Sequence, residues 1–279
     1  MTTHTGTGST GTIRYRINDS KKGFPVRPVH VEASRQDLDR IVESGFLLTS
    51  DWFPRDLLDR MAAAIDRLTT DEQDHPSGEH IPGNGFYLRH LMDKDPAFLE
   101  LLHFQPTLSI ARALLGPQVW MDVEARVAYA GEPDRLVPWH IHHRVIPDPL
   151  PPFFCYPHAI NCLLYLDDID DAEGPLVILP GSHRQHALQI PDGDERDLAG
   201  QVLVRPRQGD CLIMHVNLWH RTLRTRAECR QRRVVIWGYQ PSWLKSAVTR
   251  GVKVEHRLTG PLLEGGDPET VELLDGFHW

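Results

Sequence analysis

The sequence predicts a mainly β fold with flanking helices, whose strands form a sandwich or a jelly roll. In the first part of the chain, up to Gly116, apolar residues recur at helical spacing. From Val119 onward they form short runs that are separated by turn residues such as Pro180, Gly181 and Ser182. Many short strands in succession are typical of β-sandwiches and jelly rolls.

The N-terminal part is predicted to be helical after a flexible tail. Residues 1–33 are rich in Thr and Gly and then become basic, so we expect them to form this tail. Ser34 is a favourable N-cap for a helix that ends at Gly45. A short buried strand is expected at Phe46–Thr49, and a second helix begins near Pro54, which is tolerated in a first turn.

A polar loop is expected to separate these helices from the next ones. Thr69–Gly85 contains several Pro and Gly residues. Ala97–Leu115 then predicts two helices with a break near Pro106. The segment from Val248 is expected to hold two short β-like pieces and an acidic helix. The strands of the core are predicted at Val119–Ala130, Val137–His143, Ala159–Leu166, Leu176–Leu179, Gln201–Val204, Asp210–His215 and Arg233–Tyr239.

These elements predict one domain after the tail. With 279 residues, of which 41% are hydrophobic, the chain is long enough to bury a sizeable core. We expect a single domain over residues 34–279. It would have a helical part over 34–116, a jelly-roll core over about 117–245 and a C-terminal extension over 246–279.

The charge of the chain argues against some classes of partner. The formal net charge is −8, which disfavours binding to nucleic acid or to an anionic membrane. No apolar run approaches the length of a transmembrane helix, and the polar N-terminus lacks the apolar core of a signal peptide. Cys162 and Cys211 lie in apolar runs, so buried thiols in a reducing cytoplasm are expected.

Three histidines form the main candidate site. His140 and His142 alternate within a predicted strand, so their imidazoles project from the same face. His220, from a later strand, would complete a set of three ligands on one face of a metal ion. Non-haem Fe(II) oxygenases use such a set, usually with two His and one carboxylate. Three imidazoles are also a ligand set of hydrolytic zinc, so the residues alone leave both metals open.

Several motifs occur in a specific order between residues 35 and 245. They are Glu43–Leu48, Leu114–Gly116, Trp139-His140, Leu164–Asp168, Glu173–Leu176, Leu179–His183, Gly209-Asp210, Trp219-His220 and Arg232-Arg233. In this order the set resembles the phytanoyl-CoA dioxygenase-like (PhyH) family of Fe(II)/2-oxoglutarate-dependent oxygenases. The resemblance implies a double-stranded β-helix (jelly-roll, cupin-like) core. It also implies Fe(II), 2-oxoglutarate and O2 as cofactor and co-substrates, with His140 and His220 as iron ligands.

The resemblance further implies how the co-substrate is held. Arg232 would bind the distal carboxylate of 2-oxoglutarate, because a guanidinium can bind a carboxylate bidentately. Arg233 points to the opposite face of the strand and is the alternative anchor. Asn161 and Arg126 lie where the resemblance places the co-substrate or its neighbours. Glu124 and Arg126 alternate on one strand, so the alternative for these two is a structural ion pair.

The chain departs from the family pattern at one position. The family has Asp or Glu two residues after the first His, whereas this chain has His142. Strand alternation predicts that His142 is the third metal ligand, and Glu124 is the first alternative. His215 is expected to be structural, and His143 points the other way.

A Pro- and Phe-rich loop follows the histidine pair. We expect Pro147–Pro157 to close over the substrate, because loops beside a rigid site often carry function. Five aromatic residues are candidates either for the pocket or for the core, namely Trp139, Phe153, Phe154, Trp219 and Trp237.

The sequence therefore predicts a cytoplasmic Fe(II)/2-oxoglutarate-dependent dioxygenase. It would oxidise an unactivated C–H bond of a small molecule, by hydroxylation or oxidative cyclisation, in natural-product (antibiotic) biosynthesis. We expect a monomer or homodimer that binds neither nucleic acid nor a membrane. The alternatives are a three-His oxygenase or a zinc hydrolase that does not use 2-oxoglutarate, and an inactive member that only binds a ligand. Neither of the first two needs a carboxylate anchor at Arg232.

Overall fold

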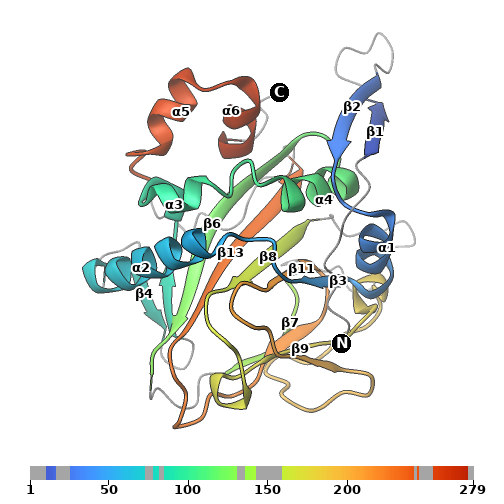
Figure 1. Ribbon diagram of the computed structural model, residues 1–279. Helices are drawn as coiled ribbons and strands as arrows, with labels where there is room; N and C mark the ends of the chain where they lie inside the picture. The colour runs from blue at the N-terminus through green and yellow to red at the C-terminus, as the bar shows by residue number, and fades with distance from the viewer. Residues whose placement is uncertain are drawn as a thin grey trace.

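The computed structural model has two main β-sheets, a separate two-stranded sheet and a layer of helices (Figure 1). It describes residues 11–16, 26–72, 78–81, 85–130, 136–142, 159–241, 244 and 254–275. The larger sheet has the strand order β3-β11-β8-β13-β6-β5-β4, and the smaller has the order β10-β9-β12-β7. All pairings among the described strands are antiparallel. Antiparallel sheets whose neighbouring strands are distant in the chain are typical of a jelly roll.

The strands have six residues or fewer, apart from two strands of ten residues in the larger sheet, β6 and β13. This sheet contains β3 (Phe46–Thr49), β4 (Gly78–Ile81), β5 (Gly85–Leu88), β6 (Val119–Ala128), β8 (Ile160–Tyr165), β11 (Cys211–His215) and β13 (Arg232–Pro241). The smaller sheet contains β7 (Val137–His140), β9 (Leu176–Ile178), β10 (Val202–Val204) and β12 (His220–Thr222). Most of these bounds agree with the predicted strands to within three residues.

Helices cover one face of the larger sheet, where Figure 1 shows α2, α3 and α4. Ser34 caps α1 as predicted, because its hydroxyl oxygen accepts a hydrogen bond from the backbone N–H of Asp37, and Gly45 ends the helix with a φ of 87°. The α-helices are α1 (Arg35–Ser44), α2 (Arg55–Asp71), α3 (Pro96–Leu99), α4 (Gln105–Leu115), α5 (Thr259–Gly265) and α6 (Pro268–Asp275). Short 3-10 helices lie at Leu91–Asp93, Asp171–Glu173 and Ser182–Arg184.

Strand alternation separates two apolar clusters. The main core lies between the helices and the larger sheet, where Met61 of α2 and Leu108 of α4 are buried in the same cluster as Val123 and Trp237. A second cluster joins the two sheets and includes Leu163, Tyr165, Ile178, Val204 and Met214. Burying apolar surface on both faces contributes roughly 25 cal/mol for each Å², so both faces of the larger sheet are held firmly. Cys162 and Cys211 are buried free thiols, as predicted.

Part of the predicted tail is folded. Within residues 1–33, β1 (Gly11–Arg16) pairs with β2 (Val26–Val31) to form a two-stranded sheet. The β-branched and aromatic residues of Thr12–Tyr15 favour a strand, but the surrounding basic residues and Pro28 obscured this pattern.

The prediction of a loop over Thr69–Gly85 was wrong in part. Within it, α2 extends to Asp71, and β4 forms a hairpin with β5. After Val248, the described residues 254–275 contain no strand and form helices α5 and α6, of which α6 is the predicted acidic helix. Residues 248–253 of the segment predicted to hold two β-like pieces lie outside the described residues. Short strands of this kind depend on a neighbouring strand for their hydrogen bonds, so their own composition is a weak signal.

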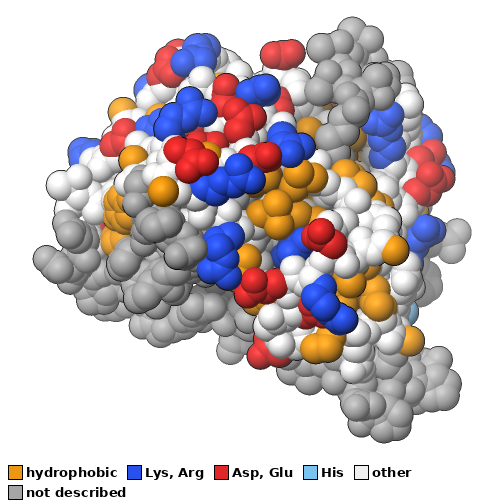
Figure 2. Space-filling view, turned by 90° about the horizontal axis from the view of Figure 1, so that it is seen from below, with side chains coloured by type: hydrophobic (Ala, Val, Ile, Leu, Met, Phe, Trp, Pro, Cys, Tyr) orange, Lys and Arg blue, Asp and Glu red, His pale blue; other side chains and the backbone are white. Residues whose placement is uncertain are grey.

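On the face of the molecule in Figure 2, neither sign of charge dominates. Acidic and basic side chains are interspersed there around an apolar area. Among the helices of the described residues, none has the length and apolar character needed to cross a membrane.

Candidate metal centre

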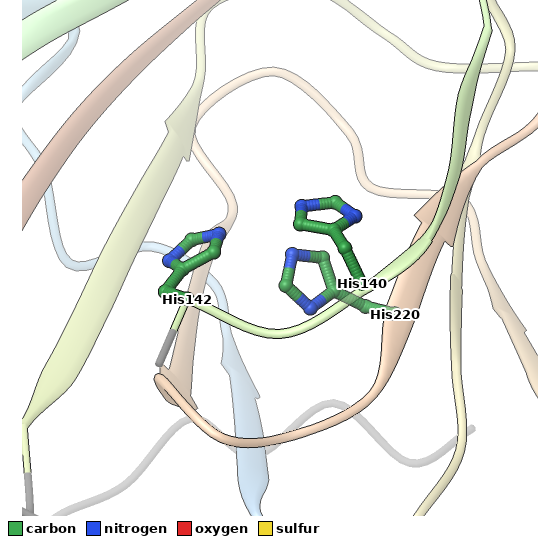
Figure 3. Close-up of side chains that lie close together, drawn as sticks. All are labelled: His140, His142 and His220. Atoms are coloured by element: carbon green, nitrogen blue, oxygen red, sulfur yellow. The ribbon is translucent and has the colours of Figure 1, made fainter. Parts of the chain in front are cut away.

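Three histidines from two segments converge between the sheets. His140 ends β7 and lies directly opposite His220, which begins β12. The ring centroids of these two side chains are 4.2 Å apart, and that of His142 lies 4.9 Å from His220 and 5.4 Å from His140. One nitrogen of each ring lies within 4.8 Å of the other two, and Figure 3 shows the three rings around a common space. In the described part of the chain, no other group of His, Cys, Asp or Glu is so arranged.

The backbone explains why His142 joins the other two. The strand β7 ends at His140, three residues before the predicted end at His143. The backbone N–H of His142 donates to the carbonyl oxygen of Val216, at 2.9 Å, so the segment after β7 remains tied to the turn before β12. This bond keeps His142 beside His140 although regular pairing has stopped.

Two of the histidines have a defined tautomer. The Nδ1 of His140 lies 2.9 Å from the carbonyl oxygen of Pro138, and the Nδ1 of His220 lies 2.7 Å from that of Leu218. A carbonyl oxygen can only accept, so each Nδ1 carries the proton and each Nε2 keeps a lone pair for a metal. Burial, and then the charges of His140 and His142, hold the pKa of His220 well below its usual value. A neutral imidazole is the form that binds metal.

Arg232 is a buried cation on the face of β13 that points between the sheets. Only 4% of its surface is exposed, and its Nη1 donates to the carbonyl oxygen of Gly174 at 2.7 Å. Its Nε has no hydrogen-bond partner, and no described carboxylate forms an ion pair with it. Burial lowers the pKa of Arg232. A buried guanidinium in this state is suited to a carboxylate ligand, because an uncompensated buried charge is costly.

Arg233 lies on the opposite face and is already paired. Its Nη2 lies 2.6 Å from Asp167 Oδ1, and its Nη1 lies 2.8 Å from Asp66 Oδ2. The hydrogen bond to Asp167 raises the pKa of Arg233. Of the two predicted anchors, Arg232 is therefore the one whose guanidinium has no carboxylate partner among the described residues.

Strands β5 and β6 add a polar wall to the space between the sheets, formed by Tyr87, Glu124 and Arg126. Glu124 and Arg126 alternate with Val123, Ala125 and Val127, which are buried on the helical side. The hydroxyl of Tyr87 donates to Glu124 Oε1 at 2.6 Å, and Arg126 Nη2 donates to the Tyr87 oxygen at 3.3 Å.

The electrostatics of this wall link it to the histidines. Burial, followed by the charge of Glu124, raises the pKa of Tyr87 to about 12, so the phenol stays protonated. Burial also raises the pKa of Glu124. The charge of Arg126 is among the smaller causes that lower the pKa values of both His220 and Arg232. Arg126 is thus close enough to act on both groups.

The structure brings some predicted residues together and not others. Asn161 lies beside His142, with its amide 2.7 Å from the Nδ1 of that ring. His215 is outside the triad, and its ring lies 5.3 Å from that of His183. Trp237 belongs to the core on the helical side, while Trp139 and Trp219 share a cluster with Val177. His143 and Pro147–Pro157, which include Phe153 and Phe154, lie outside the described residues.

Tyr87 was not among the site residues predicted from the sequence. This residue follows the segment predicted as a loop, and its role depends on the pairing that sets it opposite Arg126. The alternation of Phe86, Tyr87 and Leu88 was the signal for a half-buried strand.

Comparisons with known proteins agree with this fold. Residues 41–234 match the phytanoyl-CoA dioxygenase (PhyH) family. An ectoine dioxygenase of Bordetella parapertussis is 27% identical over 149 residues, which are 50% of this chain and 46% of that protein. The chain thus matches about half the length of this curated relative.

Two solved structures are similar across most of the chain. AviO1 from Streptomyces viridochromogenes Tue57 has 24% identity and a TM-score of 0.59, with 76% of this chain and 96% of that chain covered. SnoN, a non-haem α-ketoglutarate-dependent epimerase from nogalamycin biosynthesis, has 17% identity and a TM-score of 0.56. The match to SnoN covers 78% of this chain and 91% of that chain.

These likenesses confirm the predicted jelly-roll core of the double-stranded β-helix type. The sequence match is independent of them and covers well over half of the chain, from α1 to the start of β13. The protein therefore belongs to the phytanoyl-CoA dioxygenase (PhyH) family.

Proposed function

We propose that this protein is an Fe(II)/2-oxoglutarate-dependent dioxygenase that oxidises an unactivated C–H bond of a small molecule. The observation that carries the proposal is the convergence of His140, His142 and His220 in a space that also holds the uncompensated guanidinium of Arg232. A metal site explains the histidines, and a dianionic co-substrate explains the arginine. Family membership and the α-ketoglutarate dependence of SnoN support the same reading.

The histidines hold the metal. His140 and His220 present Nε2 because their Nδ1 atoms are bound to backbone carbonyls, and the low pKa of His220 keeps that ring neutral. Three facial ligands leave positions on Fe(II) for 2-oxoglutarate and O2. When bound, these groups supply the oxidising chemistry, in which 2-oxoglutarate is decarboxylated to succinate.

Arg232 and Arg126 position the co-substrate. Arg232 binds the distal carboxylate of 2-oxoglutarate, which provides the counter-charge that the described residues do not supply. Arg126 adds a second positive charge that acts on His220 and helps to orient the metal-binding end. Charge-assisted pairs with a guanidinium fix orientation as well as affinity.

The polar wall faces the substrate. Glu124, held by Tyr87, offers hydrogen-bond acceptors to a polar group of the substrate, while the apolar cluster between the sheets limits access of water. The reaction is hydroxylation or oxidative cyclisation, and we assign it to natural-product biosynthesis, as the source of SnoN supports. A zinc hydrolase or a 2-oxoglutarate-independent oxygenase has no dianionic co-substrate to pair with the buried guanidinium of Arg232.

The remaining proposals concern the whole chain. We propose that residues 34–279 form one domain, which is supported by the presence of Leu273 in the same core cluster as Ile41. A small-molecule substrate, a cytoplasmic location and a monomer or homodimer stay predictions from the sequence.

The proposal is tested by succinate release. Purified protein with Fe(II), 2-oxoglutarate and O2 should form succinate above background, and candidate natural-product substrates should stimulate the rate. The His220→Ala variant should form none, because it lacks a buried ligand. Hydrolysis of substrate by a zinc-loaded protein, with no succinate formed under any condition, would replace the oxygenase with the zinc alternative.

A further inference from the structure

The side chain of Asn161 contacts the histidine that replaces the usual carboxylate. Asn161 lies on β8, opposite Gly238 of β13 and Met214 of β11. Its neighbours Ile160 and Cys162 are buried on the helical side, so Asn161 faces the space between the sheets. The amide atom placed beside His142 is Nδ2, 2.7 Å from the ring Nδ1. The other ring nitrogen of His142 points toward His140 and His220 (Figure 3).

The identity of the amide atom facing His142 decides whether this ring can bind metal. The oxygen and nitrogen of an Asn amide have nearly the same shape and are assigned from their hydrogen bonds. If the nitrogen faced the ring, Nδ1 would accept and the proton would sit on Nε2, which would block a metal. If the oxygen faces the ring, Nδ1–H donates to it and the lone pair of the ring lies on Nε2, as in His140 and His220.

We infer that Asn161 is a positioning residue whose side-chain carbonyl accepts the Nδ1–H of His142 and directs its Nε2 to the metal. It takes the part that the backbone carbonyls of Pro138 and Leu218 take for the other two rings. This inference rests on the proposed metal site. An imidazole ligand needs such an acceptor for its Nδ1–H, whereas a carboxylate ligand does not.

Gly238 makes the arrangement possible. A Cβ placed on Gly238 would lie 2.8 Å from Asn161 Oδ1, the amide atom that points away from His142, which is closer than real Cβ contacts. When the amide is turned so that its oxygen faces His142, the amide nitrogen takes this place and needs the same room. A glycine inside a strand often marks the close approach of another group. Gly238 therefore leaves room for the Asn161 amide in the rotamer that reaches His142.

Two nearly isosteric variants separate an accepting role from a donating one. Asn161→Asp can only accept, and Asn161→Leu can do neither. Fe(II) or Co(II) affinity, measured anaerobically without 2-oxoglutarate, should be kept or tightened in N161D and weakened roughly 10- to 100-fold in N161L. Electron paramagnetic resonance of the Cu(II)-loaded protein should show one nitrogen ligand fewer in N161L than in the parent. Metal affinity that falls in N161D, or that is unchanged in N161L, would overturn the inference.

A second background shows whether Asn161 acts through His142. In the His142→Asp variant the third ligand needs no acceptor, so adding Asn161→Leu should leave metal affinity unchanged. This rescue also excludes unfolding as the cause of the loss in the single variant. An equal loss in both backgrounds would contradict the inference.

The outcomes distinguish this inference from the proposed function. If Asn161 instead binds the co-substrate, N161L should lose 2-oxoglutarate affinity while keeping metal affinity, and the inference fails while the oxygenase remains. If the parent binds metal with the predicted dependence on Asn161 but never binds 2-oxoglutarate, the inference holds and the oxygenase fails.

Discussion

Arg232 and Arg233 are adjacent in the chain but lie in opposite environments. Strand alternation directs Arg233 toward α2, and its charge is paired with Asp66 of that helix and with Asp167, which follows β8. The same alternation buries Arg232 between the sheets, where it donates to the carbonyl oxygens of Glu173 and Gly174 and no described carboxylate pairs with it. This pair therefore provides a matched test of the co-substrate site.

We predict that Arg232→Ala raises the dissociation constant of 2-oxoglutarate roughly 30-fold or more, since losing a buried charged pair costs about 2 kcal/mol or more. Calorimetric titration of the metal-loaded protein measures this change. Arg233→Ala is the control and should leave 2-oxoglutarate affinity within a factor of about 2, because its partners are carboxylates of the protein. Equal losses in both variants would reject Arg232 as the anchor.

A second residue-scale prediction concerns pH. His90 Nδ1 lies 3.0 Å from Asp122 Oδ2, and this hydrogen bond raises the pKa of His90. A pKa that is higher in the folded state than in the unfolded state stabilises the fold below the unfolded value, near 6.5. The stabilisation is lost as the pH rises through the folded pKa.

Urea unfolding of the parent and of His90→Gln tests this sign. The difference in the free energy of unfolding between the parent and the variant should be larger at about pH 5 than at about pH 9, by up to roughly 1 kcal/mol. Asp122 is partly exposed, which limits the size of the effect. A loss that grows toward alkaline pH would contradict the assignment.

At the scale of elements, the segment 194–198 is bound to the strands that carry the histidines. The guanidinium of Arg221, on β12, bonds to the carbonyl oxygen of Glu195 and to Asp197, and it lies 5.3 Å from the ring centroid of Trp139 on β7. The indole N–H of Trp139 donates to the carbonyl oxygen of Arg196 at 2.8 Å. One side chain thus ties this segment to both ligand-bearing strands.

We predict that Arg221→Ala releases this segment without unfolding the core. Hydrogen exchange of 194–198 should accelerate at least about 10-fold, which corresponds to about 1.4 kcal/mol of lost protection, while β6 and β13 stay protected. Arg205→Ala is the control, since its ion pair is made with Asp171, outside the segment 194–198. Unchanged exchange at 194–198 in the Arg221 variant would count against this role.

Some of the strands could be predicted from the sequence and others could not. Long strands such as β6 and β13 alternate apolar and polar residues, so their faces follow from local pattern. The hairpin β4–β5 escaped prediction because the Pro and Gly residues of Thr69–Gly85 indicated a loop, and its strands are defined by their pairing with each other and with β6. The histidine spacing predicted the metal centre, but the contact of Asn161 with His142 depends on the register of three strands, which composition does not encode.

At the scale of the whole molecule, the fold carries the site in the space between two sheets. The helices pack through the main core on the outer face of the larger sheet. The smaller sheet lies over the inner face of the larger sheet and carries His140 and His220. Two of the proposed metal ligands, His140 and His220, come from the smaller sheet, and the proposed anchor Arg232 comes from the larger one. Co-substrate binding should therefore link the two sheets.

The central claim is that the three histidines and Arg232 hold Fe(II) and 2-oxoglutarate together. The most direct measurement is the visible absorption of the protein on anaerobic addition of Fe(II) and then 2-oxoglutarate, because chelation of the metal by this co-substrate gives a charge-transfer band. We predict that the band appears in the parent, is absent in His140→Ala, and needs much more 2-oxoglutarate in Arg232→Ala. Stoichiometric Fe(II) binding by the parent with no band at any 2-oxoglutarate concentration would contradict the account.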